Sequence, residues 1–342
     1  MSRMDSLKHI ETIKMRLKRI LFNAIESVIP NTTVKNIPPI SNDTVIPEVF
    51  NKYGERIKLC YLLSPGSEHH PYGITDGRVP QFILWDRFNF KLDIHFYSSE
   101  SIFTKQLGGK KHYGLLLESE TIIPDVYNKI RKRQQYVEDN LDTLFTHSKE
   151  ILSLISNAKF CPAYSVWYGT PKWGGTMIDY QEKSKMLSFV GCDKAMTQMH
   201  YFRQEVTHRY LNSEKVDVMG KAVNRFASCN EIYSPYRYNI ALENASYDYY
   251  FTEKIMNCFA AKTVPIYYGC PSIGDFFNTD GIIVVKEPTL KAIESALALC
   301  NEQDYELRKA AIDDNYNRVK KYLCVEDFLC NHYSEILEIE KK

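Results

Sequence analysis

One segment of the sequence combines residue types that could grip and release a phosphate-bearing leaving group. A strand-like run ends at Leu242, and a polar loop then leads into a predicted helix that begins near Thr252. A helix start with free N–H groups and a neighbouring lysine forms an anion site, and a carboxylate can accept two hydrogen bonds from a ribose diol. The residue types indicate a nucleotide diphosphate site, and its candidates are Glu243, Asn244, Ser246, Tyr250, Glu253 and Lys254.

A Glu-Lys pair at a helix start is also common as a plain complement to the helix dipole, so a family resemblance adds weight. The pattern ENAS…YYFTEKI…TVPIYYG, within Tyr236 to Phe277, resembles the hallmark of the family 10 glycosyltransferases, the α1,3/α1,4-fucosyltransferases. In that family an ENS-like tripeptide, an aromatic-x-TEK and a VP(I/V)-aromatic-x-G strand occur in this order and at this spacing. The resemblance extends from about Lys185 to Asn278; before residue 180 only Leu115 to Tyr127 looks similar.

The resemblance implies donor-binding roles for residues of the second half. Glu253 would hold the ribose hydroxyls, and Lys254 would contact the diphosphate. Arg203, within HYFRQEV, matches the family arginine that neutralises phosphate, a task that suits a bidentate guanidinium. Asn244 and Tyr250 fall on positions that line the donor pocket.

The activity that the resemblance implies is an inverting transfer of L-fucose from GDP-fucose to a hydroxyl of an oligosaccharide or polysaccharide, as in surface polysaccharide or glycan synthesis. Ala245 stands where the family has serine, and Tyr247 and Tyr249 make the loop rich in tyrosine. Another GDP-sugar, such as a heptose or L-galactose, therefore stays an alternative donor. A non-catalytic carbohydrate-binding protein is a third hypothesis, disfavoured because a lectin needs no diphosphate clamp.

An inverting transfer needs a base that takes the acceptor proton while the bond to the leaving group breaks. Glu118 is the first candidate, because it ends the strand-like run Gly114 to Leu117 and aligns best with the family glutamate. Glu120 is the alternative, since it would share the face of Glu118 in an extended segment. His147, at the end of another predicted strand, is a third candidate, although a lone histidine is usually structural.

Metal ligands are not evident in the sequence. Many transferases bind a metal through an Asp-x-Asp motif, but Asp313 and Asp314 lie in a predicted helix, and no CxxC pair occurs. We therefore expect no cofactor and no metal, with Arg203, Lys254 and the helix start neutralising the leaving group.

Composition limits the class of protein. The chain has 342 residues, 44% of them hydrophobic and 25% charged, which is typical of a soluble globular protein. Its net charge of +1 gives no field that would recruit nucleic acid. Nine cysteines, an odd number, favour a reducing compartment, and no run approaches the roughly 18 apolar residues of a membrane span. We expect a cytoplasmic protein.

Strand-like and helical segments alternate along the chain, as in parallel sheets covered by helices. The fold class expected is α/β of the GT-B type, with two Rossmann-like domains facing a cleft. Strands are predicted at 57–63, 92–97, 113–117, 143–146, 186–190, 238–242, 264–268 and 282–285. The predicted parts are an amino-terminal helix and linker (1–35), an acceptor-binding domain with the base (36–172), a GDP-sugar-binding domain (173–330) and a helical tail (331–342).

Two further features carry weaker expectations. Residues 5–29 have apolar residues at helical spacing and basic residues on other faces, which favours a helix packed on the first domain. A membrane-surface anchor is the alternative, and it would make the protein peripheral at the inner membrane face. Trp85, Trp167 and Trp173 could stack on acceptor sugars, with core packing an equal alternative for Trp85.

Overall fold

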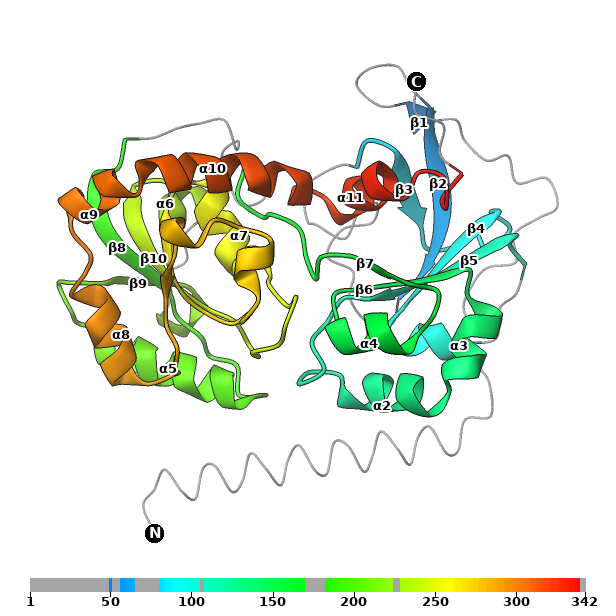
Figure 1. The fold of residues 1–342 in the computed structure, drawn as a ribbon, viewed down its shortest axis with the longest axis horizontal. Coiled ribbons are helices and arrows are strands. Elements are labelled where there is room, and N and C mark those ends of the chain that lie inside the picture. Colours follow the sequence, from blue (N-terminus) through cyan, green and yellow to red (C-terminus); the bar gives the residue numbers. More distant parts are fainter. Residues whose placement is uncertain are drawn as a thin grey trace, which may run out of the picture. The chain divides into compact units, whose positions relative to one another are not determined.

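The computed structural model describes residues 49–50, 56–64, 80–104, 108–169, 182–223 and 228–338. The helix expected at residues 5–29 and Trp173 lie outside these residues. Two sheets of mainly parallel strands order the described chain, each with helices on its faces (Figure 1). The expected α/β class, with two Rossmann-like parallel-sheet regions, is confirmed.

The first sheet is parallel except at one edge, where β1 runs antiparallel to β2. Within the described residues its strands follow the order β1-β2-β4-β5-β6-β7, with β3 also paired to β2. The strands are β1 (Val49–Phe50), β2 (Arg56–Leu63), β3 (Ile83–Asp86), β4 (Ile94–Ser98), β5 (Lys111–Leu116), β6 (Thr143–Thr146) and β7 (Ala158–Phe160).

Both faces of the first sheet are buried, which explains why its strands are apolar without alternation. Phe96 and Tyr97 are neighbours in β4, yet they belong to the separate cores on the two faces. One face is covered by α2 (Pro124–Lys132), α3 (Gln134–Asn140) and α4 (Lys149–Leu154), and η1 (Ser99–Phe103) adds Ile102 to the same core.

The opposite face is covered from the far end of the chain. Helix α11 (Val325–His332) lies in the range expected for the second domain and tail, but Val325 and Leu329 pack in the core of the first sheet. The Trp85 Nε1 donates to the buried Glu326 Oε1 at 2.7 Å. Trp85 is therefore a core residue and not a sugar-stacking one. Trp167 packs, partly buried, against a core of the second sheet.

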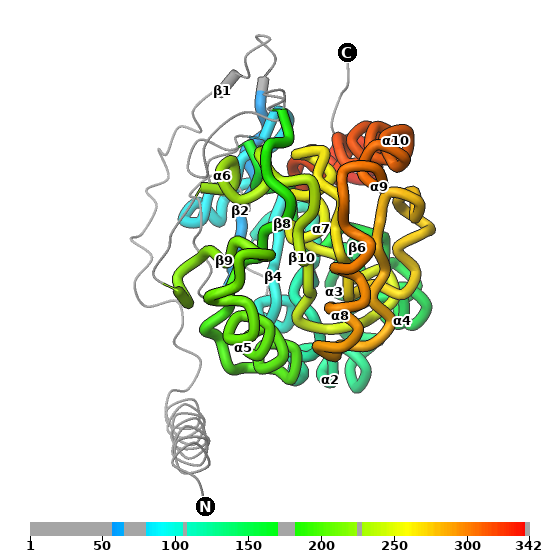
Figure 2. Tube along the Cα trace, turned by 90° about the vertical axis from the view of Figure 1, so that its left-hand side faces the viewer, coloured from blue at the N-terminus to red at the C-terminus, as the bar shows by residue number. Residues whose placement is uncertain are grey.

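The second sheet is wholly parallel in the order β12-β11-β10-β8-β9. Figure 2 shows β8 and β10 running side by side, as their pairing requires. All the strands expected here are present; β9 was not predicted. The strands are β8 (Lys185–Val190), β9 (Asp217–Met219), β10 (Tyr236–Leu242), β11 (Val264–Tyr268) and β12 (Ile283–Val284).

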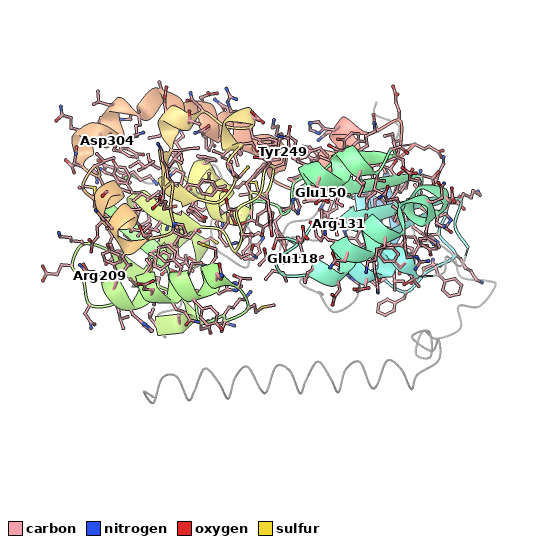
Figure 3. All side chains as sticks on the ribbon, turned by 60° about the horizontal axis from the view of Figure 1, so that its bottom comes forward. Glu118, Arg131, Glu150, Arg209, Tyr249 and Asp304 are labelled. Atoms are coloured by element: carbon pink, nitrogen blue, oxygen red, sulfur yellow. The ribbon has the colours of Figure 1, made fainter. Side chains whose placement is uncertain are left out.

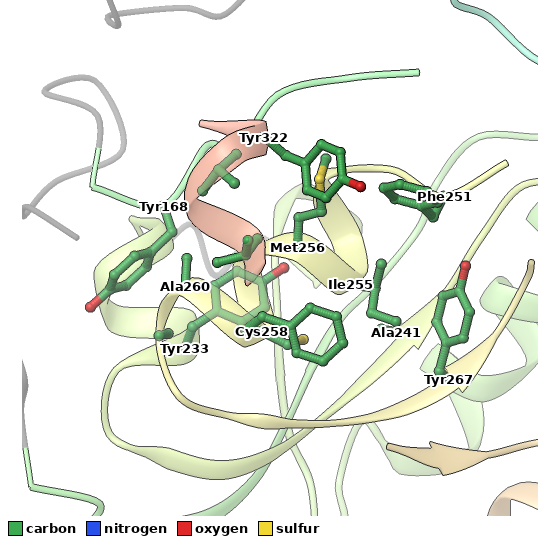
Figure 4. Close-up of a cluster of buried hydrophobic side chains, with 14 of the residues drawn as sticks. Tyr168, Tyr233, Ala241, Phe251, Ile255, Met256, Cys258, Ala260, Tyr267 and Tyr322 are labelled. Carbon is green, nitrogen blue, oxygen red and sulfur yellow. The ribbon is translucent and has the colours of Figure 1, made fainter. Parts of the chain in front are cut away.

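Helices also cover both faces of the second sheet. On one face lie α5 (Gln198–Tyr210) and α8 (Leu290–Leu297), and on the other α6 (Cys229–Tyr233) and α7 (Glu253–Ala260). Helix α10 (Lys309–Val319) contributes Ile312 to the core on the first of these faces and Val319 to the core on the second. Figure 4 shows Ile255, Met256 and Cys258 of α7 in the core with Ala241 and Tyr267 of the sheet. The remaining helical segments are η2 (Lys221–Val223), η3 (Ile273–Asp275), η4 (Thr279–Gly281), α9 (Glu302–Leu307) and η5 (Lys320–Tyr322).

Two sequence expectations bear on the protein's surroundings. Among the described helices, none is long and apolar enough to cross a bilayer. All nine cysteines are free thiols, and eight of them are buried.

A buried lysine ties the ends of two helices to the second sheet. The Lys183 Nζ donates to the carbonyl oxygens of Tyr233 and Ser234 (3.1 and 2.7 Å), to that of Ala261 (2.7 Å) and to the Thr263 hydroxyl (3.0 Å). These carbonyls lie at the carboxyl ends of α6 and α7, where a cation is favoured.

We predict that Lys183→Met lowers the free energy of unfolding by about 3 kcal/mol, because buried carbonyl groups lose their donor. Urea denaturation measures the change. Lys185→Met is the matched control: its side chain is 50% exposed and its Nζ lies 3.3 Å from Asp217, so a loss below about 1 kcal/mol is expected. Equal losses in the two variants would contradict the structural role of Lys183.

Candidate functional site

The polar residues of the candidate site follow the carboxyl ends of parallel strands, where ligands of open α/β sheets bind. In the first sheet Glu118 follows β5 and His147 follows β6. In the second sheet Glu243 follows β10 and Gly269 follows β11. The two sheets thus each contribute loops to the candidate site.

Glu243 is a buried carboxylate at the start of α7. Its Oε1 accepts from the Thr252 N–H at 2.9 Å and its Oε2 from the Thr252 hydroxyl at 2.7 Å. The Lys254 Nζ lies 3.4 Å from the same Oε2. Burial raises the pKa of Glu243, and the Lys254 ammonium opposes that rise. Glu243 was among the candidate ligand residues named from the sequence. Its structural role follows only from its burial in the fold.

Lys254 lies between two carboxylates. Its Nζ is 2.9 Å from Glu253 Oε1 and 3.0 Å from the Thr252 hydroxyl, in addition to the contact with Glu243. Burial opposes the charge on both partners. Even so, the ammonium lowers the pKa of Glu253, and the two carboxylates raise the pKa of Lys254. The lysine is therefore a fixed positive charge at neutral pH.

Free N–H groups were expected at the start of α7, and for two of these groups the expectation is wrong. The Thr252 N–H donates to Glu243, and the Lys254 N–H lies 3.4 Å from the Thr252 hydroxyl. A carboxylate of the chain itself occupies the place that was expected for a ligand. An anion bound here would depend on cationic side chains and not on the helix end.

Arg203 is the second cation, on α5. Its Nη2 lies 3.5 Å from the Val190 carbonyl, and its buried Nε has no partner within the described residues. The pKa of the neighbouring His200 is lowered to about 4, first by burial and then by the charges of Arg203, Lys194 and Lys254. The charge of Arg203 also opposes protonation of Lys254. The two predicted phosphate ligands thus lie close enough to share one positive field.

Glu118 lies in the loop after β5 and is held by two hydrogen bonds. Its Oε2 accepts from the Tyr164 hydroxyl at 2.8 Å, and its Oε1 accepts from the Ser119 N–H at 2.7 Å. The Ser119 hydroxyl in turn donates to Asn244 Oδ1 at 3.3 Å. The structure therefore brings the predicted base next to a predicted donor-pocket residue.

Two tyrosines, Tyr250 and Tyr164, are hydrogen-bonded to Asn244 and Glu118 respectively. The Tyr250 hydroxyl donates to Asn244 Oδ1 at 2.7 Å, and its ring centroid lies 4.9 Å from that of His147. Burial, then Glu118, and more weakly Glu253 and Glu243, raise the pKa of Tyr164 well above its usual value. Tyr164 thus stays a hydrogen-bond donor to Glu118. Tyr164 was not among the residues singled out from the sequence.

The alternative bases have different surroundings. Both oxygens of Glu120 accept from the Arg131 guanidinium at 2.8 Å. Arg131 also pairs with Glu150, and both of these residues are labelled in Figure 3. His147 is 1% exposed, and burial lowers its pKa to about 4. Glu118, by contrast, pairs with no cation in the part of the chain that the structure describes.

Gly269, the last residue of VPIYYG, lies directly against the buried carboxylate. A Cβ at this position would overlap the Glu243 Cγ and the Tyr267 hydroxyl. The Ser246 hydroxyl donates to the Gly269 carbonyl at 2.7 Å, which holds the two loops together. Glycine is therefore needed for close approach, and its place in the motif has a physical reason.

Ala245, which stands where the family has serine, is 5% exposed and packs with Ala163 and Tyr250. The departure from the family pattern thus lies in an apolar contact next to Asn244. For metals, no group of three or more His, Cys, Asp and Glu side chains that could hold an ion is found among the described residues.

Comparison with known proteins adds a family match. Residues 180–309 match the model of glycosyltransferase family 10 (fucosyltransferase), carboxy-terminal part. The resemblance expected from the motifs is confirmed for this part of the chain. The alpha-(1,3)-fucosyltransferase of Helicobacter pylori is 38% identical over 58 residues, which are 17% of this chain and 12% of that relative.

Solved structures show more distant likenesses. An alpha1,3-fucosyltransferase crystallised with GDP is 15% identical, with a TM-score of 0.48 over 87% of this chain and 94% of that one. The structure with GDP-fucose is 16% identical, with a TM-score of 0.47 over 88% and 95%. The functional assignment therefore depends on the family match and on the residues themselves.

We predict that Gly269→Ala lowers the free energy of unfolding by about 2 kcal/mol, because the added methyl group must displace Glu243 or Tyr267. Gly274→Ala is the matched control: its Cβ would meet Thr279 at 3.4 Å, an ordinary contact, so a change within about 0.5 kcal/mol is expected. Thermal or urea unfolding separates the two. A neutral Gly269→Ala would show that Glu243 has room to move.

Proposed function

We propose, from the match of residues 180–309 to glycosyltransferase family 10, that the chain is a glycosyltransferase which moves a sugar from a GDP-sugar to a saccharide hydroxyl. One observation supports this most directly: two cations, Arg203 and Lys254, share a field at the carboxyl ends of the second sheet, beside Glu253. A carbohydrate-binding protein without activity has no use for such a cluster.

L-Fucose is the proposed sugar, because the motifs resemble those of fucosyltransferases and the curated relative is one. Ala245 packs next to Asn244 and Tyr250, two proposed donor-pocket residues, so the altered position adjoins the proposed sugar pocket. Another GDP-sugar, such as a heptose or L-galactose, is the second candidate for that reason.

In the proposed donor complex, Glu253 accepts hydrogen bonds from the ribose hydroxyls and Lys254 exchanges a carboxylate for the diphosphate. The exchange is favourable because the incoming phosphate brings at least as much negative charge as the carboxylate it replaces. Arg203 needs no such exchange, since its Nε has no partner and it pairs with no carboxylate among the described residues. Together the two cations stabilise the leaving GDP, and we propose that no metal ion is needed.

We propose that Glu118 acts as the base. The Tyr164 hydroxyl and the Ser119 N–H hold the carboxylate in one orientation, and each oxygen keeps a further lone pair for the acceptor hydroxyl. Deprotonation on the face opposite the departing GDP gives inversion at the anomeric carbon. Glu120 is less suited, because both of its oxygens are already engaged by Arg131.

A cytoplasmic location is part of the proposal, supported by nine free cysteines, most of them buried. Peripheral contact with the inner membrane face, through residues 5–29, lies outside the described residues.

We predict that GDP raises the melting temperature of the wild-type protein in EDTA, and that UDP and CMP raise it less, because only the native state binds the right nucleotide. Arg203→Ala and Lys254→Ala should weaken GDP binding on the order of tenfold to hundredfold, the size of a lost charged hydrogen bond. Arg203→Ala is the cleaner variant, since Lys254→Ala also strands two carboxylates.

The exposed Lys291 on α8 offers a control, and Lys291→Ala should bind GDP like the wild type. Wild-type affinity in Arg203→Ala, or GDP binding that requires Mn²⁺, would argue against the proposed leaving-group site.

We predict that Glu118→Gln retains GDP binding but loses turnover by roughly 10² to 10⁴-fold, as expected for a missing general base. Glu120→Gln is the comparison variant and should stay within about tenfold of the wild type, since its role is an ion pair. Initial rates of transfer measure both. An active Glu118→Gln would move the role of base to Glu120 or His147.

A further inference from the structure

A cavity of ≈ 420 Å³ adjoins the loop that carries Glu118. Its walls come from the loops and helices after β5 and β6 and from the loop after β10. The residues that line the cavity include Glu120, Tyr127, His147, Lys149, Glu150, Ser153, Tyr247 and Asp248.

The cavity shares a wall with the backbone of the proposed base. The Tyr127 hydroxyl donates to the Glu118 carbonyl at 3.0 Å, and the His147 Nε2 lies 3.4 Å from the same oxygen. Both side chains line the cavity. A molecule bound there would contact the two side chains that lie against the Glu118 carbonyl, while the Glu118 carboxylate itself does not line the cavity.

The lining offers the groups that bind a sugar. The Tyr247 side chain is 39% exposed and presents an aromatic face, and its hydroxyl is held by Thr121 at 2.8 Å. An aromatic face in a cavity lined by polar side chains suits a ring that carries both C–H groups and hydroxyls.

The charges disfavour an anionic ligand. Glu120, Glu150 and Asp248 line the cavity, whereas Lys149 is the lining cation. Arg131 pairs with Glu120 and Glu150, and Lys149 pairs with Asp248 at 3.1 Å. The carboxylates outnumber the cations even when Arg131 is counted. Positive charge that could attract an acidic group is already neutralised.

We propose that this cavity is the acceptor subsite and that it takes an uncharged saccharide, not one bearing a carboxylate, sulfate or phosphate. The inference rests on the proposed function, because it assigns the second substrate of the same reaction. It places Tyr247 as the surface that contacts the acceptor ring and Asp248 as the group that keeps Lys149 from binding anions.

The test is to fill the cavity. Ser153 lies on α4, is exposed, and its hydroxyl donates to the carbonyl of Lys149 at 3.0 Å. Ser295 on α8 is exposed and makes the same bond to the Lys291 carbonyl at 3.0 Å, and it is not among the residues that line the cavity. Ser153→Trp should therefore obstruct the cavity, and Ser295→Trp serves as a matched control of equal size and setting.

Saturation-transfer NMR with neutral probes (galactose, N-acetylglucosamine, lactose and N-acetyllactosamine) measures saccharide binding, and a GDP melting shift measures the donor site separately. We predict that Ser153→Trp weakens saccharide binding at least about tenfold and leaves the GDP shift unchanged, while Ser295→Trp matches the wild type. Saccharide binding that survives Ser153→Trp, or a wild type that binds no neutral probe, would overturn the inference. If GDP does not raise the melting temperature of the wild type, that result would instead contradict the proposed function.

A second variant tests the preference for an uncharged saccharide. Asp248→Asn releases Lys149, so binding of glucuronic acid and N-acetylneuraminic acid should rise about fivefold relative to the neutral probes, as expected for one added cation near the surface. An unchanged ratio, or a wild type that already prefers the acidic probes, would contradict an uncharged acceptor.

Discussion

The candidate site depends on one partly buried ammonium group. Lys254 lies against Glu253 and Glu243, and each partner would be costly to bury alone. Three pieces of the motif meet at this point: the glutamate of ENAS is Glu243, TEK supplies Thr252 to Lys254, and the last glycine of VPIYYG is Gly269. They are separate in the chain and form a single electrostatic unit in the fold, because each is needed to bury or balance the same charges.

The longer strands could be predicted from the sequence, since apolar runs and their breaks mark them. Short elements could not: β7 and β9 span only Ala158–Phe160 and Asp217–Met219, too few residues for a periodic pattern. The packing of α11 on the first sheet could not be predicted from the sequence either. An amphipathic helix shows which face is buried, but not which of two cores covers it.

For the site, the motif indicated which residues to examine but not how they are paired. Whether the N–H groups of α7 are free depends on where the carboxylate of Glu243 points, and burial of that side chain is a property of the fold. The same holds for the choice between Glu118 and Glu120. Both occupy similar places in the sequence, and only the position of Arg131, eleven residues further on from Glu120, distinguishes them.

The packing of α11 has a consequence for how the protein is made. Val325, Leu329 and Leu337 complete the core of the first sheet, so that sheet keeps an open apolar face while the ribosome synthesises the second one. The amino-terminal half cannot finish folding as it emerges, because several core residues of its sheet follow the second sheet in the chain. The core of the second sheet also takes Phe328 of α11, so this one helix completes the cores of both sheets.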